Sequence, residues 1–195
     1  MVMAVDQARI RSELRKVLSP GRVRHTLAVA GLASELARRH GEDPEKAELA
    51  GLLHDWAKEL SASRLAAYSR RYRLAVPQRA LVERHSPHLL HGYVSAHMAR
   101  KRFGIKDRDV LAAISHHTLG SPRMSLLEKI VYVADLGSPD RKFSQAKIVR
   151  DLALKDLPAA FRQALGIKIR HVIEHGRWLH PMTVSLWNHI QQHEN

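Results

Sequence analysis

Hydrophobic positions recur at helical spacing along almost the whole chain, and glycine and proline divide the pattern into segments. Small or apolar residues at Leu27, Ala30, Gly31, Ser34 and Ala37, for example, fall on one face of a helix. Alternation of polar and apolar residues, which is typical of a strand, is almost absent. The pattern therefore predicts an all-helical (all-α) bundle.

Proline, glycine and capping residues predict where the helices begin and end. Pro20-Gly21 separates a first helix from a second that stops at Gly41, and Pro44 opens a third that ends near His54. From Pro77 to Ser86-Pro87 the pattern predicts a short irregular stretch. A further helix is predicted from about His88 to Arg102, where Gly104 stops it, and Asp107 is expected to cap the next helix. Ser125 to Glu128 form a capping box that opens another helix, and two C-terminal helices are expected to start at Pro158 and Thr183.

Length and composition are those of one globular domain. The chain has 195 residues, of which 45% are hydrophobic and 26% charged. It has no cysteine, which excludes a disulfide framework and a thiolate zinc site. No apolar run approaches the roughly 20 residues that span a bilayer, and the N-terminus lacks a secretory pattern. We therefore expect a cytoplasmic protein without a membrane partner.

The formal net charge of +13 is the one unusual bulk property. A positive excess of this size attracts polyanions, from nucleic acid to a small polyphosphate. The basic residues are dispersed in short pairs such as Arg38-Arg39 and Arg70-Arg71, without a long basic tract. A dedicated nucleic-acid arm is therefore not indicated, although the charge leaves nucleic-acid binding open beside an ordinary solvated basic surface.

The strongest local signal of chemistry is the pair His54-Asp55, which follows the apolar run Ala50 to Leu53. Burying two such groups without partners is costly, and a divalent metal provides a partner for both. An exposed helix end, where both side chains meet water, is the competing interpretation of the pair alone. His25, His91, His117 and Asp135 also stand on apolar helices or at their ends. If these helices converge, six ligands are available, enough for a metal pair with open positions.

The other histidines give weaker signals, because a lone histidine more often lies on the surface or in packing contacts than at a metal. We assign no site role to His40, His97, His171, His175, His189 and His193.

With these residues in view, the chain resembles the HD-domain superfamily of metal-dependent phosphohydrolases, and within it the YqeK family. The matching segments are Arg22-x-x-His25-Thr26, Leu53-His54-Asp55-x-Ala57-Lys58, Pro87-His88-Leu-Leu-His91-Gly92, His117-Thr118-x-Gly120, Met124-Ser125-x-x-Glu128-Lys129, Ala134-Asp135 and Pro139-x-Arg141. The resemblance implies an HD-type helical core over residues 18–141 or so, followed by C-terminal helices over about 142–195.

The resemblance also implies the reaction, which is symmetrical cleavage of diadenosine tetraphosphate, a small nucleotide polyphosphate, into two ADP by a metal-activated water. His25, His54, Asp55 and Asp135 would hold one metal, and His91 and His117, with Asp55 bridging, the other. The family favours iron, while manganese, cobalt and zinc suit the same ligands. His54 and Asp55 would thus be catalytic as well as metal-binding. The sequence leaves a homodimer open.

Further residues are candidates for contact with the substrate. Lys58 lies one helical turn beyond His54 and is expected to serve as a catalytic point charge on phosphate. Arg22 and Arg141 could bind phosphate oxygens, and Thr118 and Gly120 belong to the same presumed substrate side. His88 is a candidate proton donor, and Trp56 or Tyr132 a candidate platform for adenine. Plain solvation, local backbone bonding and core packing are the competing interpretations of these residues.

The sequence departs from the usual family pattern beside the presumed phosphate site. Leu119 stands where a second threonine is usual, Ser121 where a basic residue is usual, and Gly137-Ser138 where Ile-Glu is usual. These positions leave the exact nucleotide open. The alternatives are another HD-type reaction, on a nucleoside monophosphate or a guanosine alarmone, and a basic RNA- or ribosome-associated protein with a non-catalytic metal site.

Overall fold

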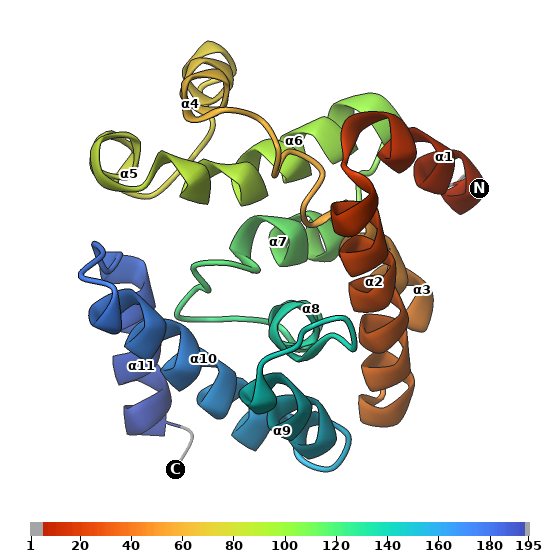
Figure 1. The fold of residues 1–195 in the computed structure, drawn as a ribbon, viewed down its shortest axis with the longest axis vertical. Helices are drawn as coiled ribbons and strands as arrows, with labels where there is room; N and C mark the ends of the chain where they lie inside the picture. Colours follow the sequence, from red (N-terminus) through yellow and green to blue (C-terminus); the bar gives the residue numbers. More distant parts are fainter. Residues whose placement is uncertain (1–5, 194–195) are drawn as a thin grey trace.

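The computed structural model describes residues 6–193 and contains only helices in that range (Figure 1). The predicted all-α class is therefore confirmed. In chain order the elements are α1 Gln7–Val17, α2 Pro20–His40, α3 Pro44–Leu53, α4 Ala62–Arg71, α5 Arg79–His85, the 3₁₀ helix η1 Pro87–Leu90, α6 His91–Phe103, α7 Arg108–His116, α8 Leu126–Gly137, α9 Ser144–Ala153, α10 Leu157–Glu174 and α11 Pro181–His193.

Most of the predicted boundaries agree with the structure because the capping residues act locally. Gly41 and Gly104 end α2 and α6 in the left-handed conformation, and the Asp107 carboxylate caps α7. Ser125 and Glu128 form both halves of the capping box that opens α8.

The prediction of an irregular stretch between Pro77 and Ser86-Pro87 was wrong, since α5 occupies most of it. The cap residue that precedes this helix, Gln78, has a positive φ of 50° and makes no capping hydrogen bond with its side chain. The usual helix-start signal is therefore missing from the sequence. Helices α4 and α9 were likewise not predicted.

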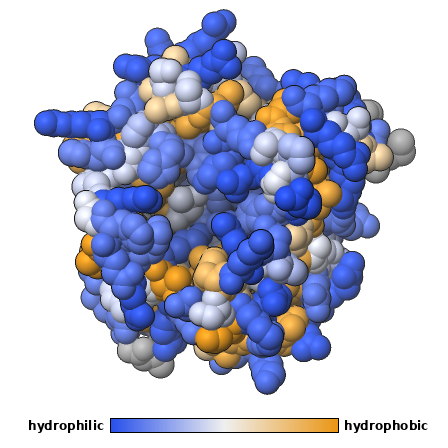
Figure 2. Space-filling model, in the orientation of Figure 1, coloured by the Kyte–Doolittle hydropathy of each residue, from blue (hydrophilic) through white to orange (hydrophobic). Residues whose placement is uncertain are grey.

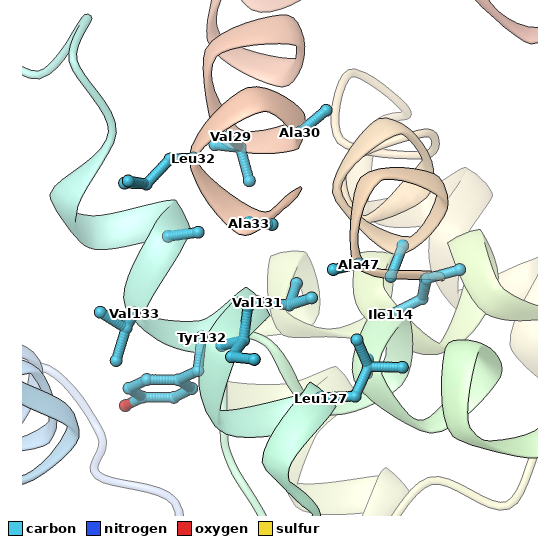
Figure 3. Packing of buried hydrophobic residues seen from close by; sticks show 14 of the residues in the cluster. Val29, Ala30, Leu32, Ala33, Ala47, Ile114, Leu127, Val131, Tyr132 and Val133 are labelled. Carbon is cyan, nitrogen blue, oxygen red and sulfur yellow. The ribbon is translucent and has the colours of Figure 1, made fainter. Parts of the chain in front are cut away.

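Four helices, α2, α3, α7 and α8, pack around the main hydrophobic core. Figure 3 shows Val29 and Ala33 of α2, Ala47 of α3 and Val131 of α8 directed toward one another across this core. The two largest fully buried side chains, Tyr132 and Phe161, meet edge to face with ring centroids 5.2 Å apart.

Two glycines allow the close approach of helices that carry site residues. A Cβ on Gly51 of α3 would lie 2.7 Å from the Ala30 Cα of α2. A Cβ on Gly92 of α6 would lie 2.8 Å from the Ser115 carbonyl oxygen of α7. Because no side chain separates these backbones, the residues next to the glycines can reach a common point.

Of the C-terminal helices, α9 and α10 pack against α8 and each other, and α11 packs on α10 (Figure 1). Long-range hydrogen bonds tie them to earlier loops: the Thr183 hydroxyl donates to the Leu119 carbonyl, and the His180 Nε2 lies 3.2 Å from the Pro77 carbonyl. Figure 2 shows the face of the molecule hollowed near its centre, with hydrophilic residues around the hollow. Within residues 6–193, none of the helices combines the length and apolar character that a bilayer crossing requires.

Candidate active site

The six predicted ligands come from five separate helices or their ends. They are His25 in α2, His54 and Asp55 just after α3, His91 at the start of α6, His117 just after α7 and Asp135 in α8. The four histidines and Asp55 are each at most 4% exposed. The helix ends therefore bring polar groups into an otherwise apolar core, where each group needs a partner.

These side chains form two groups that share one carboxylate. Nitrogen and oxygen atoms of His25, His54 and Asp55 lie within 4.8 Å of one another, and so do those of Asp55, His91 and His117. The Asp55 Oδ2 lies 3.5 Å from the His54 Nε2, whereas its Oδ1 lies 3.1 Å from the His91 Nε2. Each oxygen of Asp55 thus faces a different group, which is the geometry of a bridging ligand.

Asp135 lies against the first group. Its Oδ1 is 3.2 Å from the His25 Nε2 and 4.0 Å from the His54 Nε2. The structure therefore brings all six predicted ligands together, with Asp135 beside His25 and His54.

The backbone fixes the tautomers of three of the histidines. In each ring the Nδ1 lies close to a carbonyl oxygen three residues earlier, which can only accept a hydrogen bond. The pairs are His54 with Gly51 at 2.7 Å, His91 with His88 at 2.6 Å and His117 with Ile114 at 2.8 Å. Each Nδ1 is therefore the donor, and each Nε2 of a neutral ring presents a lone pair to the centre of the site.

This lone-pair arrangement fits a metal. The Nε2 atoms of His91 and His117 lie 3.0 Å apart, and two lone pairs facing each other are unfavourable unless a cation lies between or beside them. Among the described residues, the buried His54 Nε2 and Asp55 Oδ1 find no hydrogen-bond partner. Imidazole nitrogens and carboxylate oxygens with their lone pairs turned inward are the donor set of a divalent transition-metal site.

Electrostatics keep the two aspartates ionised. Burial alone would raise the pKa of Asp55, but His54, His117 and His91 hold this pKa well below its usual value. The pKa of Asp135 is also well below its usual value, because Lys168, His25 and Arg141 outweigh burial. Burial lowers the pKa of His117 to about 3, so this ring is neutral at neutral pH, as a metal ligand must be.

His25 is oriented by a carboxylate that the sequence-based prediction did not include. Its Nδ1 lies 3.0 Å from the Asp140 Oδ2, and the Ser138 hydroxyl donates to the Asp140 Oδ1 at 2.6 Å. A carboxylate on the far nitrogen of a histidine fixes the ring and directs its other nitrogen toward a metal. The signal in the sequence was weak, because Asp140 lies in a loop and its partner is more than a hundred residues away.

Two cations bind the Asp135 carboxylate, and only one of them was predicted. Arg141 donates to the Asp135 Oδ1 at 2.7 Å and to its backbone carbonyl at 3.1 Å. Lys168 of α10 lies 3.3 Å from the Asp135 Oδ2 and donates to the His117 carbonyl at 2.9 Å. Its ammonium also lies 3.8 Å from the centre of the Tyr132 ring. Lys168 stands outside the recognised motifs, so nothing in the sequence singled it out.

Three further predicted residues lie at the ligand groups. Arg22 donates to the Asp55 Oδ2 at 2.9 Å. The Lys58 Nζ lies 3.3 Å from the His91 Nε2, although the chain has left the α-helix at Leu53 and continues in turns. The Thr118 hydroxyl lies 2.9 Å from the His117 Nε2, which can accept a hydrogen bond from it.

His88 and Gly120 lie farther from the ligand groups. His88 lies in η1, where partial burial of its ring, together with the charges of Lys58 and His91, lowers its pKa. Gly120 has a φ of +72°, and a Cβ there would lie 2.2 Å from the Leu186 Cδ2 of α11. A packing role therefore explains Gly120, and its contact with substrate stays a prediction.

The two aromatic residues suggested as adenine platforms are core residues. Trp56 is 6% exposed and packs edge to face on Phe103, with ring centroids 4.9 Å apart. Tyr132 is fully buried. Neither ring has a face open to a base, so this suggestion was wrong.

The positions that depart from the family pattern have structural partners here. Leu119 is buried and its carbonyl accepts the bond from Thr183, while Ser121 is half-buried. The Gly137 carbonyl accepts a hydrogen bond from Arg150, and Ser138 supports Asp140. Leu119 therefore serves packing and Ser138 the orientation of His25 through Asp140, nothing in the structure explains Ser121, and the ligand groups remain complete.

A cavity of about 680 Å³ opens beside the ligand groups. Asp135, Arg141, Lys168, Thr118 and His88 all line it. Its size is in the range of small-ligand sites, and its basic lining suits an anionic ligand.

Comparison with known proteins agrees with this geometry. Residues 22–138 match the HD domain family. The chain is 35% identical to a symmetrical bis(5'-nucleosyl)-tetraphosphatase of Bacillus subtilis (strain 168), over 90% of this chain and 92% of that protein. It is 34% identical to a protein of the same name from Staphylococcus aureus (strain NCTC 8325 / PS 47), over 71% of this chain and 70% of that one.

A solved structure extends the similarity to the whole fold. The crystal structure of a predicted HD superfamily hydrolase involved in NAD metabolism, from Clostridium acetobutylicum, superposes with a TM-score of 0.90 at 36% identity. The superposition covers 96% of this chain and 97% of that one. The helices that carry the ligand groups and the C-terminal helices therefore belong to a shared fold. The chain is a member of the HD domain family, in the branch that contains the symmetrical bis(5'-nucleosyl)-tetraphosphatases.

Proposed function

We propose that this protein is a metal-dependent hydrolase that cleaves diadenosine tetraphosphate symmetrically into two ADP, and that it acts in the cytoplasm. The observation that carries the proposal is the pair of buried ligand groups sharing Asp55. The similarity to the Bacillus subtilis tetraphosphatase over 92% of its length supports the choice of substrate.

The proposed metal ligands are those in which lone pairs and carboxylates converge. One divalent metal would be held by His25, His54, Asp55 and Asp135, and another by His91, His117 and the shared Asp55. Divalent cations bound there would supply an acidified water and neutralise charge on the transferring phosphoryl group. We propose iron, with manganese, cobalt or zinc as the alternatives that the same ligand types accept.

The basic residues around the groups are proposed to bind the polyphosphate. Arg22, Lys58 and Arg141 each lie against a carboxylate or imidazole of the ligand set, and Arg141 also lines the cavity. Arginine can donate two parallel hydrogen bonds to a phosphate, and lysine acts as a point charge. Their positive charge stabilises the negative charge that builds up on the phosphoryl oxygens.

Smaller contributions are assigned to Thr118, Gly120 and His88. The Thr118 hydroxyl, beside the second ligand group, can donate to a phosphate oxygen. Gly120 allows the chain to turn next to Thr118. His88 lines the cavity, and since its lowered pKa keeps the ring neutral at neutral pH, it is suited to a hydrogen bond with the leaving phosphate. We also propose that His88 can transfer this proton to the leaving phosphate and so act as the proton donor of the reaction.

Identification of the products tests the proposal. Protein purified anaerobically, with its metal content measured, is incubated with diadenosine tetraphosphate in ¹⁸O-labelled water. We expect ADP as the sole nucleotide product, with one labelled oxygen in half of the molecules. ATP together with AMP would contradict symmetrical cleavage. Turnover only of a nucleoside monophosphate or a guanosine alarmone would favour another HD-type reaction, and salt-sensitive RNA binding without any turnover would favour the binding protein.

A further inference from the structure

A separate cavity of about 500 Å³ opens on the outer side of α6, and we call it the α6 cavity. It is lined by His97, Arg100, Lys101, Gly104 and Lys106, and it shares no lining residue with the cavity beside the ligand groups. Its four residues from His97 to Gly104 follow one another at helical spacing, so they lie on one face of α6. Helix α4 packs on the outer side of α6, whereas α7 packs on the other side (Figure 1).

We propose that the α6 cavity and the aromatic cluster beside it bind single-stranded nucleic acid, with phosphates on Arg100, Lys101 and Lys106 and a base stacked on Tyr72. The inference goes beyond the proposed function, which uses none of these residues. It also gives the positive charge of the chain a partner, because a net charge of +13 exceeds what one tetraphosphate neutralises.

The cations of the α6 cavity are available to a ligand. Arg100, Lys101 and Lys106 are exposed, and none of them makes an ion pair with another described residue. Within residues 6–193 no carboxylate lines the cavity. The adjacent Asp107 is already engaged, because it caps α7 and pairs with Lys46 at 2.8 Å. Three positive charges around one small cavity repel one another, and an anion relieves this repulsion.

His97 adds an uncharged donor to these cations. Burial and the charges of Lys101 and Arg100 lower its pKa, so the ring is neutral at neutral pH. The neutral ring can accept a hydrogen bond from the Tyr68 hydroxyl, which lies 3.0 Å from its Nδ1. In that tautomer the Nε2 carries the hydrogen, and it can donate to a phosphate oxygen in the cavity.

An aromatic cluster borders the α6 cavity at His97. The centroid of the Tyr72 ring lies 4.6 Å from that of Tyr68 and 4.7 Å from that of His97, and the Arg71 guanidinium lies 5.7 Å from it. Tyr72 is nevertheless 41% exposed. The ring is thus supported by neighbours and still accessible. Because every base has a π face, an accessible aromatic ring beside a basic groove is suited to single-stranded nucleic acid.

The order of these residues suits a strand better than a single nucleotide. From His97 to Lys101 the helix rises roughly 6 Å, at about 1.5 Å per residue. Gly104 then ends α6 with a φ of 68°, and the chain turns so that Lys106 lines the same cavity. The cations therefore form a row that leads away from Tyr72, and a chain of phosphates can follow this row.

Binding of a short fluorescein-labelled oligouridylate to the metal-loaded protein, followed by anisotropy at several KCl concentrations, tests the inference. For Arg100→Gln/Lys101→Gln we expect about 10- to 30-fold weaker binding at about 0.1 M salt. The slope of log K against log salt should become smaller by about 1.4, since each phosphate contact on a single strand contributes about 0.7. Tyr72→Ala should bind about 5- to 100-fold more weakly with an unchanged slope, and Tyr72→Phe should stay within about twofold of the parent.

A matched control removes two charges at the opposite end of the molecule. Arg38 and Lys155 are exposed there, where α2 ends beside the loop after α9 (Figure 1). Since charges beyond roughly 10 Å are largely screened at about 0.1 M salt, Arg38→Gln/Lys155→Gln should keep the parent affinity.

The inference is overturned if the parent protein does not bind the oligouridylate, or if the two double variants lose affinity equally. It is also overturned if Arg100→Gln/Lys101→Gln or Tyr72→Ala binds as the parent does. All of these variants should hydrolyse diadenosine tetraphosphate at the parent rate. Failure of the proposed function would therefore appear in the hydrolysis assay, with oligouridylate binding intact.

Discussion

The ligand groups differ in how their residues are held from the wall of the 680 Å³ cavity that the end of α10 and the loop after it form, between Lys168 and Trp178. In the ligand groups, three histidines bond to carbonyls three residues earlier in the chain: Gly51, His88 and Ile114. In the wall and its supports, the corresponding contacts join distant parts of the sequence. Lys168 contacts His117. His180, which packs edge-on against Trp178, contacts Pro77, which is more than a hundred residues away.

This difference matches a difference in burial. The ligand histidines are at most 4% exposed, whereas Trp178 and Lys168 are half-buried and face the cavity. Groups that bind a metal need fixed lone pairs and an environment from which water is excluded. Groups that recognise a substrate must remain accessible to it. We infer that chemistry depends on the buried part of the site, in which three of the ligand rings are oriented by local backbone contacts, and recognition on the accessible part.

The largest expected effect is at the carboxylate that both ligand groups share. In Asp55→Asn the bridging charge is lost and one oxygen is replaced by an amide nitrogen, which is a poor metal ligand. We expect hydrolysis to fall by at least about 10³-fold, as for other central catalytic groups, together with the metal content. Metal analysis and steady-state rates measure both.

Asp151→Asn is the control for this substitution, because Asp151 lies in an exposed ion pair with Lys147 on α9. It should leave rate and metal content unchanged. Retention of full activity and metal by a folded Asp55→Asn protein would contradict the shared site.

A smaller effect is expected at Asp140, which acts on the ligand groups only through His25. Its carboxylate lies 3.0 Å from the His25 Nδ1, so Asp140→Asn weakens the orientation of the ring and the basicity of its other nitrogen. We expect metal affinity to fall about 10- to 100-fold, the usual range for such supporting carboxylates. Competition with a chelator measures the affinity.

The readout that separates positioning from direct catalysis is the dependence on metal concentration. Because Asp140 supports a ligand, excess metal should restore most of the rate of Asp140→Asn, whereas it should not restore Asp55→Asn. A loss of rate in Asp140→Asn that saturating metal leaves unchanged would contradict the positioning role.

The local part of the site could be predicted from the sequence. His54-Asp55 and His117 follow apolar helical runs, Asp107 and Ser125 cap the starts of α7 and α8, and Gly104 ends α6. Periodicity and capping are properties of neighbouring residues, so a single sequence contains them. The ligand residues could therefore be recognised in the sequence as ionisable groups on apolar helices, where each needs a partner if it is buried.

The rest could not be predicted, because its signals are tertiary. Lys168 resembles any lysine of an amphipathic helix until α10 packs against α8. Asp140 and Trp178 lie in loops whose partners are far away in sequence. Trp56 showed the opposite error, since it was a candidate platform for adenine and its ring belongs to the core.

The smallest expected effect on binding therefore concerns Trp56, the aromatic residue nearest in sequence to the ligands. Its ring is 6% exposed, packs on Phe103 and lies under the Arg102 guanidinium, 5.6 Å from the ring centroid. Trp56→Phe removes core volume, so we expect a loss of roughly 1–2 kcal/mol in the free energy of unfolding. Affinity for ADP should change less than about twofold, since no base can reach the ring.

Urea unfolding and ADP titration of Trp56→Phe, set beside Trp178→Leu, compare the two regions directly. The core position should alter stability without binding, and Trp178 should alter binding with little change in stability, because its side chain is half-buried and lines the cavity. Weaker ADP binding by Trp56→Phe at unchanged stability would place base recognition next to the metal ligands. The division between a buried centre for chemistry and an accessible wall for recognition would then be wrong.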